Sequence, residues 1–234
     1  MIGGILLLGS KHRLKLAELA TAFAAGALLA AAFVDLLPEA FNETDNISLI
    51  ALMILAGILI FFIMESTITS FHSHRHQEDK SASPVVPMLI IGDLVHGAID
   101  GIAIAVGFLV DPIMGIVVTI AVATHEIPQE IGEFGLMLHR GVQRGKVLLI
   151  HLLTMLITPI AAVVFFLVGS SAQIEISPVL ALVAGFFIYI AVSDIIPDIH
   201  GRKSRRRVIT QSAILLAGLI IVGVLIWLLR SFVA

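Results

Sequence analysis

Long apolar runs separated by short polar linkers dominate the pattern of hydrophobic and polar positions in this 234-residue chain. A helix that crosses a bilayer needs about 20 consecutive apolar residues. Runs of that length lie at about 17–38, 48–71, 85–110, 112–138, 146–169, 178–199 and 208–232. Residues 1–9 are apolar but short and carry no cleavage-site pattern, so we interpret them as the end of a truncated first span. The pattern predicts an all-α, polytopic membrane helical bundle of eight spans, numbered here from one to eight.

The composition supports this class. Hydrophobic residues make up 59% of the chain and charged residues 13%, whereas a soluble domain carries about 25% charged residues. The mean hydropathy is +1.08. We therefore expect one transmembrane domain over residues 1–234 and no soluble domain. The chain has no cysteine, which excludes disulfides, thiolate zinc sites and cysteine nucleophiles.

Charges in the linkers alternate between the two sides. Every one of the 14 Lys and Arg residues except Arg230 follows span one, three, five or seven. The opposite linkers carry only acidic charges, which are Glu39, Glu43, Asp45, Asp111 and Glu175. The positive-inside rule then places the basic linkers in the cytoplasm and both termini outside, in a multi-pass protein of the cell membrane.

One cytoplasmic linker, at about 72–83, is rich in histidine. It carries His72, His74 and His76 directly after span three. Short His-rich tracts bind zinc-like ions weakly. The alternative is a solvated polar loop, and the sequence leaves both open.

An internal repeat relates spans two and seven. Ala25-Gly26, Asp35 and Pro38-Glu39 recur as Ala184-Gly185, Asp194 and Pro197-Asp198, each 159 residues later. Because span two runs outward and span seven inward, the two are related by an inverted repeat. Inverted repeats are typical of secondary transporters.

Polar side chains of the kind that bind metals interrupt spans four and five. His96 and Asp100 lie four residues apart on one helical face, with Asp93 one turn earlier. His125 and Gln129 are also four residues apart. An adjoining stripe on span five consists of Glu126, Glu130 and Glu133. Two such helices facing each other would surround a shared centre with imidazole and carboxylate groups.

Ionisable groups at membrane depth are costly and rare, so a cluster of them predicts a function. No Lys or Arg lies within 85–110 or 112–138, which leaves metal ions or protons as counter-charges. Imidazole and carboxylate suit zinc, iron(II) or manganese(II), and the absence of cysteine argues against copper(I). The alternative, a polar network that only holds helices together, fits poorly with so many acidic groups.

Three further features concern helix shape and packing. Pro128 lies within the span-five stripe and predicts a kink there, and Thr158-Pro159 predicts a second one in span six. Gly97, Gly101 and Ala105 recur every four residues and predict close contact with another helix. His151 in span six either joins the site or bonds a carbonyl.

At these residues the chain resembles the ZIP family of divalent-metal transporters. It is most similar to the subgroup with G-D-x-x-H-N-x-x-D-G in the fourth span and H-E-x-P-H-E in the fifth. The corresponding residues run from Gly92 to Gly101 and from His125 to Glu130, and the resemblance extends over nearly the whole chain. It implies a transporter rather than an enzyme, with eight spans and a two-metal site between spans four and five. It also implies a homodimer and movement of zinc or related ions into the cytoplasm.

The chain departs from the family pattern at two site positions. Gly97 stands where the family usually has Asn, and Gln129 replaces a His. The first change removes one ligand of the second metal position, and the second weakens a ligand but keeps an oxygen.

Two other functional classes share the ligands. An intramembrane metalloprotease needs His-Glu-x-x-His, and Gln129 occupies the place of its second His. A membrane metal sensor would not require the inverted repeat.

Our expectations for individual residues follow from the site and the repeat. We predict that His96, His125 and Gln129 serve one metal position, with Asp100 and Glu130 near both and Glu126 toward the second. Asp35 is predicted to line the outer approach and Asp194 the inner one, unless each only braces its Pro-broken helix end. Further pathway candidates are Asp93, Glu133 and Asp198. The expected cargo is Zn²⁺, with Fe²⁺, Mn²⁺ or Cd²⁺ as alternatives, and the expected partners are metal ions, the lipid bilayer and a second copy, without nucleic acid.

Overall fold

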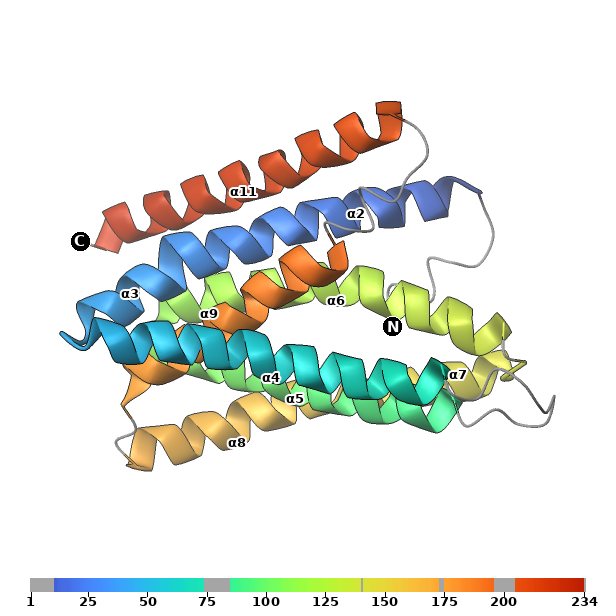
Figure 1. Ribbon diagram of the computed structural model, residues 1–234, viewed down its shortest axis with the longest axis horizontal. Helices are drawn as coiled ribbons and strands as arrows, with labels where there is room; N and C mark the ends of the chain where they lie inside the picture. Colours follow the sequence, from blue (N-terminus) through green and yellow to red (C-terminus); the bar gives the residue numbers. More distant parts are fainter. Residues whose placement is uncertain (1–10, 74–84, 140, 173–174, 196–204, 234) are drawn as a thin grey trace.

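The computed structural model describes residues 11–73, 85–139, 141–172, 175–195 and 205–233 (Figure 1). Within these ranges the chain forms helices joined by short turns. They are α2 (Lys11–Ala30), η1 (Ala31–Leu36), α3 (Leu37–Asn42), α4 (Ile47–Ser73), α5 (Val85–Val110), α6 (Pro112–His139), α7 (Arg144–Thr154), α8 (Ile157–Ala172), α9 (Ile176–Tyr189), η2 (Ile190–Ile195) and α11 (Arg205–Val233). The all-helical prediction is confirmed for the described part of the chain.

The helices coincide with the predicted spans two to eight. Six stretches of the described chain are long and apolar enough to cross a membrane, and each lies in a different predicted span. The apolar part of α6 is shorter, Pro112–Glu126, because the acidic residues of the span-five stripe occupy its second half. The protein is therefore a polytopic helical membrane protein. Residues 1–9, the predicted partial first span, lie outside the described residues.

Each membrane-spanning helical segment runs in the direction opposite to the one before it (Figure 1). The alternating charge of the linkers predicted this arrangement. The linkers that follow α3, α5 and α8 lie at one end of the bundle, and they contain the acidic residues. The starts of α7 and α11, with Arg144 and Arg205, lie at the other end. The bundle therefore separates its linker charges by sign. Which end faces the cytoplasm stays a prediction.

Asp111 has a structural role at the acidic end. Its Oδ1 accepts hydrogen bonds from the backbone N–H groups of Ile113, at 2.7 Å, and Met114, at 2.9 Å. Pro112 occupies the first position of α6, where its missing N–H costs nothing. Asp111 is thus the N-cap that starts α6 directly after α5 ends.

The repeat between α2 and α9 extends to an unusual backbone form. The π-helical segments η1 and η2 begin at Ala31 and Ile190 and end at Leu36 and Ile195, at the same offset of 159 residues as the repeated sequence (190 − 31 = 195 − 36 = 159). In η1 the Leu37 N–H donates to the Ala32 carbonyl, five residues back. Pro38, just after η1, has no N–H and cannot donate the regular helical hydrogen bond. The wider π turn accommodates the missing bond. The two segments run in opposite directions in Figure 1, as expected for an inverted repeat.

In each repeat unit, a glycine at the equivalent position lets the helix pack closely against a neighbouring long helix. Helix α2 lies along α11, where a Cβ on Gly26 would collide with the Leu215 carbonyl. Helix α9 lies along α4, where a Cβ on Gly185 would collide with the Ile54 carbonyl. Gly26 and Gly185 are the equivalent residues of the repeat. Glycine at these places allows the helix backbones to approach closely.

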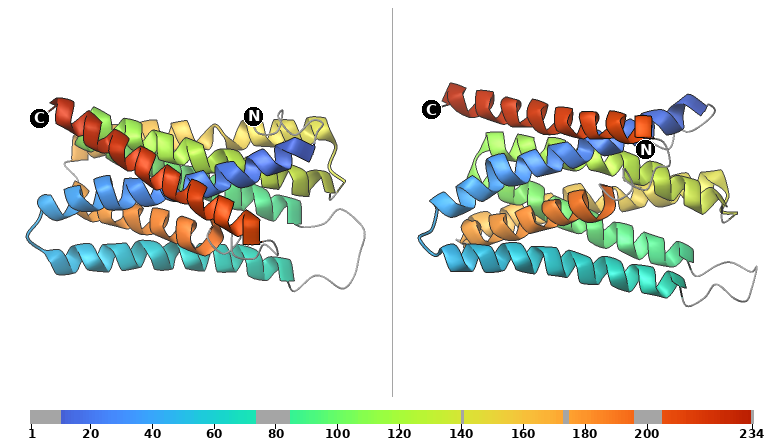
Figure 2. Two further views of the ribbon diagram at one scale, coloured as in Figure 1. Left: turned by 90° about the horizontal axis from the view of Figure 1, so that it is seen from above. Right: turned by 45° about the horizontal axis from the view of Figure 1, so that its top comes forward.

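Apolar side chains cover the outside of the bundle as well as its core. Ala24 and Leu28 of α2 and Phe187 of α9 are fully buried, whereas Leu167 of α8 and Trp227 of α11 are largely exposed. Figure 2 shows α4 and α11 on opposite outer sides of the bundle. An apolar exterior of this kind is what a lipid environment requires.

The two proline predictions have different outcomes. The chain turns at Met155–Leu156, between the end of α7 and the start of α8, which confirms the kink predicted at Thr158-Pro159. The Pro159 ring crowds the carbonyl four residues earlier and so disfavours a straight helix there. Helix α6 continues as one helix through position 128, and the kink predicted at Pro128, which does not require a break, stays a prediction.

Candidate metal centre

The site lies where α5 approaches α6, and small residues fix the other side of α5. A Cβ on Gly97 would meet Ile157 Cγ2 at 2.7 Å, and one on Gly101 would collide with the Thr158 carbonyl. These glycines therefore set α5 tightly against α8, as the small-residue ridge predicted. His96 and Asp100 then face α6 instead.

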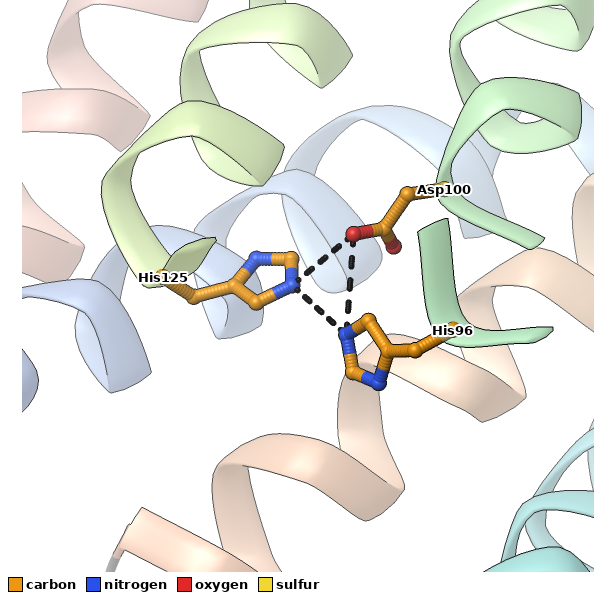
Figure 3. A group of neighbouring side chains, drawn as sticks. All are labelled: His96, Asp100 and His125. Carbon is orange, nitrogen blue, oxygen red and sulfur yellow. Dashed lines mark hydrogen bonds and ion pairs between the residues drawn. The ribbon is translucent and has the colours of Figure 1, made fainter. Parts of the chain in front are cut away.

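Three side chains from α5 and α6 converge in the bundle interior (Figure 3). His96 Nε2 lies 3.3 Å from His125 Nε2. Asp100 Oδ2 lies 3.6 Å from His96 Nε2 and 3.2 Å from His125 Nε2. All three residues are buried. The prediction that His96, Asp100 and His125 share a centre agrees with this geometry, and we call these residues the central triad.

A backbone contact fixes the orientation of one imidazole. His125 Nδ1 lies 3.1 Å from the Ala121 carbonyl oxygen, one turn earlier in α6. An oxygen of this kind can only accept, so Nδ1 carries the proton and Nε2 of the neutral ring presents a lone pair to the triad. Metal-binding histidines are commonly held in this way by the nitrogen that does not bind the metal.

Aromatic rings close the triad from the side of α4 and α9. Phe61 meets His96 edge-on, with ring centroids 5.3 Å apart and an interplanar angle of 86°. Phe187 lies 6.4 Å from His125 between centroids. Two ring nitrogens and a carboxylate thus point at one another in an apolar shell, where electrostatic interactions are strong. A cation at this point would balance the carboxylate and use both lone pairs.

The remaining predicted ligands lie beside the triad. Glu126 and Glu130 line a small cavity together with Gly97. Its other lining residues are Asp93, His151, Thr154, Met155 and Thr158. The side chain of Gln129 lies outside the described residues. A side chain at Gly97 would enter the space taken by Ile157 and Thr158 of α8, and a second metal position at this cavity stays a prediction.

Two of the predicted pathway residues meet a histidine that sequence reasoning left open. Asp93, Glu133 and His151 each offer one ligand atom, and these atoms lie within 4.8 Å of one another. His151 comes from α7. A lone polar residue in an apolar run was the only sequence signal for it.

Asp35 has a partner that the sequence did not reveal. Its Oδ1 accepts from Arg230 Nε at 2.8 Å and lies 2.6 Å from Arg230 Nη2. Arg230 Nη1 also lies 3.5 Å from Glu39 Oε2. Arg230 therefore sits among the acidic groups at that end of the bundle. This contact is compatible with the bracing alternative, and the pathway role of Asp35 stays a prediction.

The other predicted residues lie partly or wholly outside the described residues. The side chains of Asp194 and His72 lie outside the described residues, although their backbones belong to η2 and α4. Asp198, His74 and His76 lie outside them entirely.

Comparison with known proteins gives the family. The family model for the ZIP Zinc transporter matches residues 1–87 and 73–226. The chain belongs to the ZIP family. This confirms the resemblance drawn from the motifs of spans four and five.

Several relatives in the ZIP family share about three residues in ten with this chain. Zinc transporter ZIP13 of Pongo abelii is 29% identical over 213 residues, covering 85% of this chain and 63% of that protein. Zinc transporter ZIP10 of Danio rerio is 32% identical over 136 residues, covering 58% and 16%. The Zinc transporter ZIP13 homolog of Drosophila melanogaster is 28% identical over 275 residues, covering 90% and 78%. The chain thus spans less than two thirds of the first two relatives.

Proposed function

We propose that this protein transports divalent metal ions, zinc above all, across the membrane into the cytoplasm. The observation that carries the proposal is the central triad, in which two imidazoles and a carboxylate converge deep within membrane-spanning helices. Family membership and the names of the relatives, all zinc transporters, support the same cargo.

The donor set suits this cargo. Zinc is commonly bound by imidazole nitrogen and carboxylate oxygen, in sites that remain catalytic or exchangeable when a position stays open. We propose that His96, His125 and Gln129 hold the first ion, that Asp100 and Glu130 lie near both positions, and that Glu126 belongs to the second. Such ligands discriminate weakly, which keeps Fe²⁺, Mn²⁺ and Cd²⁺ as alternative cargo.

The route uses the two halves of the repeat. Alternating access requires one path from each side to a central site, and inverted repeats supply two related paths. We propose that Asp35 lies on the outer path and that Asp194 and Asp198 lie on the inner one. Because Arg230 holds Asp35 in this conformation, opening of the outer path requires that ion pair to separate. The homodimer and the orientation with both termini outside are further parts of the proposal.

Zinc uptake into liposomes tests the proposed function. Purified protein is reconstituted around a fluorescent zinc indicator, and uptake is started by adding Zn²⁺. We expect the His96→Ala, His125→Ala double variant to lose at least about tenfold in uptake, since losing even a supporting partner of a metal ligand costs that much.

His139→Ala is the matched control, because it removes an imidazole at the end of α6, away from the triad. It should transport like the unmodified protein. Uptake by the double variant at the control rate would refute transport through this site. No uptake by any of the three proteins would refute zinc as cargo.

A further inference from the structure

A second group of metal-binding side chains lies outside the central triad. Asp93 of α5, Glu133 of α6 and His151 of α7 bring one ring nitrogen and two carboxylate oxygens within 4.8 Å of one another. None of them belongs to the triad, and they come from three helices. We call them the inner cluster.

The histidine of the inner cluster points to a ligand. His151 is only 4% exposed, and its buried Nε2 has no hydrogen-bond partner. A buried polar nitrogen without a partner is costly, so native proteins rarely retain one unless water or an ion completes it. Phe134 stacks at a tilt on the same ring, with centroids 5.9 Å apart, and holds it in place.

The inner cluster is displaced from the triad along the bundle. Asp93 precedes His96 by three residues on α5, and Glu133 follows His125 by eight residues on α6. Eight helical residues correspond to about 12 Å along the axis. Both displacements lead toward the end where α7 and α11 begin with basic residues.

One small cavity has lining residues from both neighbourhoods. Asp93 and His151 of the inner cluster line it, and so do Glu126 and Glu130, which follow His125 on α6.

We infer that Asp93, Glu133 and His151 form a separate inner site that binds one divalent cation of the zinc class between the triad and the basic end. This inference rests on the proposed function, because it gives the inner site the same cargo. The site is not needed for the triad to bind metal, so the two are separable by experiment.

Counting bound zinc tests the inner site. The parent protein carries His72→Ala, His74→Ala and His76→Ala, which removes the His-rich linker. Zinc bound in detergent is titrated against a fluorescent chelator. We expect His151→Ala alone to lower the count of this parent by one equivalent. His96→Ala with His125→Ala should remove the zinc bound at the centre and leave one equivalent, and adding His151→Ala to them should leave none.

Gln211→Leu is the control for loss of a buried polar side chain elsewhere, on α11, and should keep the zinc count of the parent. Each variant must elute as a single species of unchanged size. If His151→Ala aggregates, Asp93→Asn, which preserves side-chain size, replaces it and should lose the same equivalent. Loss of all zinc with the triad variants alone, or an unchanged count with His151→Ala, overturns the inner site. In either case normal uptake by the unmodified protein leaves the proposed function standing.

Discussion

Replacing Arg230 by glutamine removes the charge opposite Asp35 while keeping an amide donor and part of the stem. Asp35 is 1% exposed and its Oδ1 accepts from Arg230 Nε and lies close to Nη2. Glutamine is shorter and neutral, so the carboxylate loses both its counter-charge and its donors. Two further acidic groups, Glu39 and Asp111, lie 3.5 and 4.0 Å from the guanidinium and then repel Asp35 without compensation.

The expected cost lies between two limits. Removing one member of a fully buried ion pair costs about 3–5 kcal/mol, and an exposed pair contributes about 0.2–1 kcal/mol. The Arg230 side chain is 37% exposed and Asp35 is buried, so an intermediate loss of about 2 kcal/mol in the free energy of unfolding is expected. For a chain of this size that loss lowers Tm by about 4–8 °C.

Thermal unfolding in detergent measures this effect, with Glu39→Gln as the matched control. Glu39 makes only the long contact to the same guanidinium, so its replacement should lower Tm by less than about 2 °C. In the double variant Arg230→Gln, Asp35→Asn, much of the loss should return, because no buried charge is left alone. An Arg230→Gln protein as stable as the Glu39→Gln protein would refute the reasoning. If Asp35→Asn leaves the KM for zinc uptake unchanged, Asp35 braces the helix and does not line the route.

Two further predictions concern packing and orientation. Gly218→Ala places a Cβ against the backbone of Phe23 and should lower the free energy of unfolding by about 1–3 kcal/mol. Gly223→Ala on the same helix meets only ordinary van der Waals contact and should be neutral or slightly stabilising. A comparison of the two Tm values checks this, and equal effects would contradict the close contact of α2 with α11. Because the chain has no native cysteine, single introduced cysteines report on which side of the membrane a linker lies. Glu43→Cys should react with a membrane-impermeant maleimide on intact cells, and Gln143→Cys only after permeabilisation. The reverse pattern would overturn the predicted topology.

The spans and the central triad were predictable because both depend on local periodicity. Apolar runs of bilayer length mark α4 and α11 without any tertiary information. His96 and Asp100, four residues apart, must share a face of whatever helix contains them. The small-residue ridge at Gly97 and Gly101 then indicates which face packs closely and which is left for the ligands.

Contacts between distant helices were not predictable in the same way. Arg230 meets Asp35 across 195 residues of sequence, and that contact depends on α2 and α11 lying parallel. The position of His151 depends on the turn between α7 and α8, whose direction a proline alone does not specify. The π-helical segments η1 and η2 were also not predictable from the apolar runs. One extra residue per turn changes the register of the backbone, but the run of apolar residues continues through it.

X-ray absorption at the zinc edge tests the central claim most directly. The sample is zinc-loaded protein in which His72, His74, His76, His151 and the three histidines outside the spans, His12, His139 and His200, are alanine, so that the triad supplies the imidazoles. We predict about two imidazole nitrogens per zinc at about 2.0–2.1 Å, with carboxylate oxygen at about 2.0–2.2 Å, and loss of one nitrogen in His125→Ala. A zinc spectrum without imidazole scattering, or one unchanged by His125→Ala, would contradict a metal site at His96, Asp100 and His125.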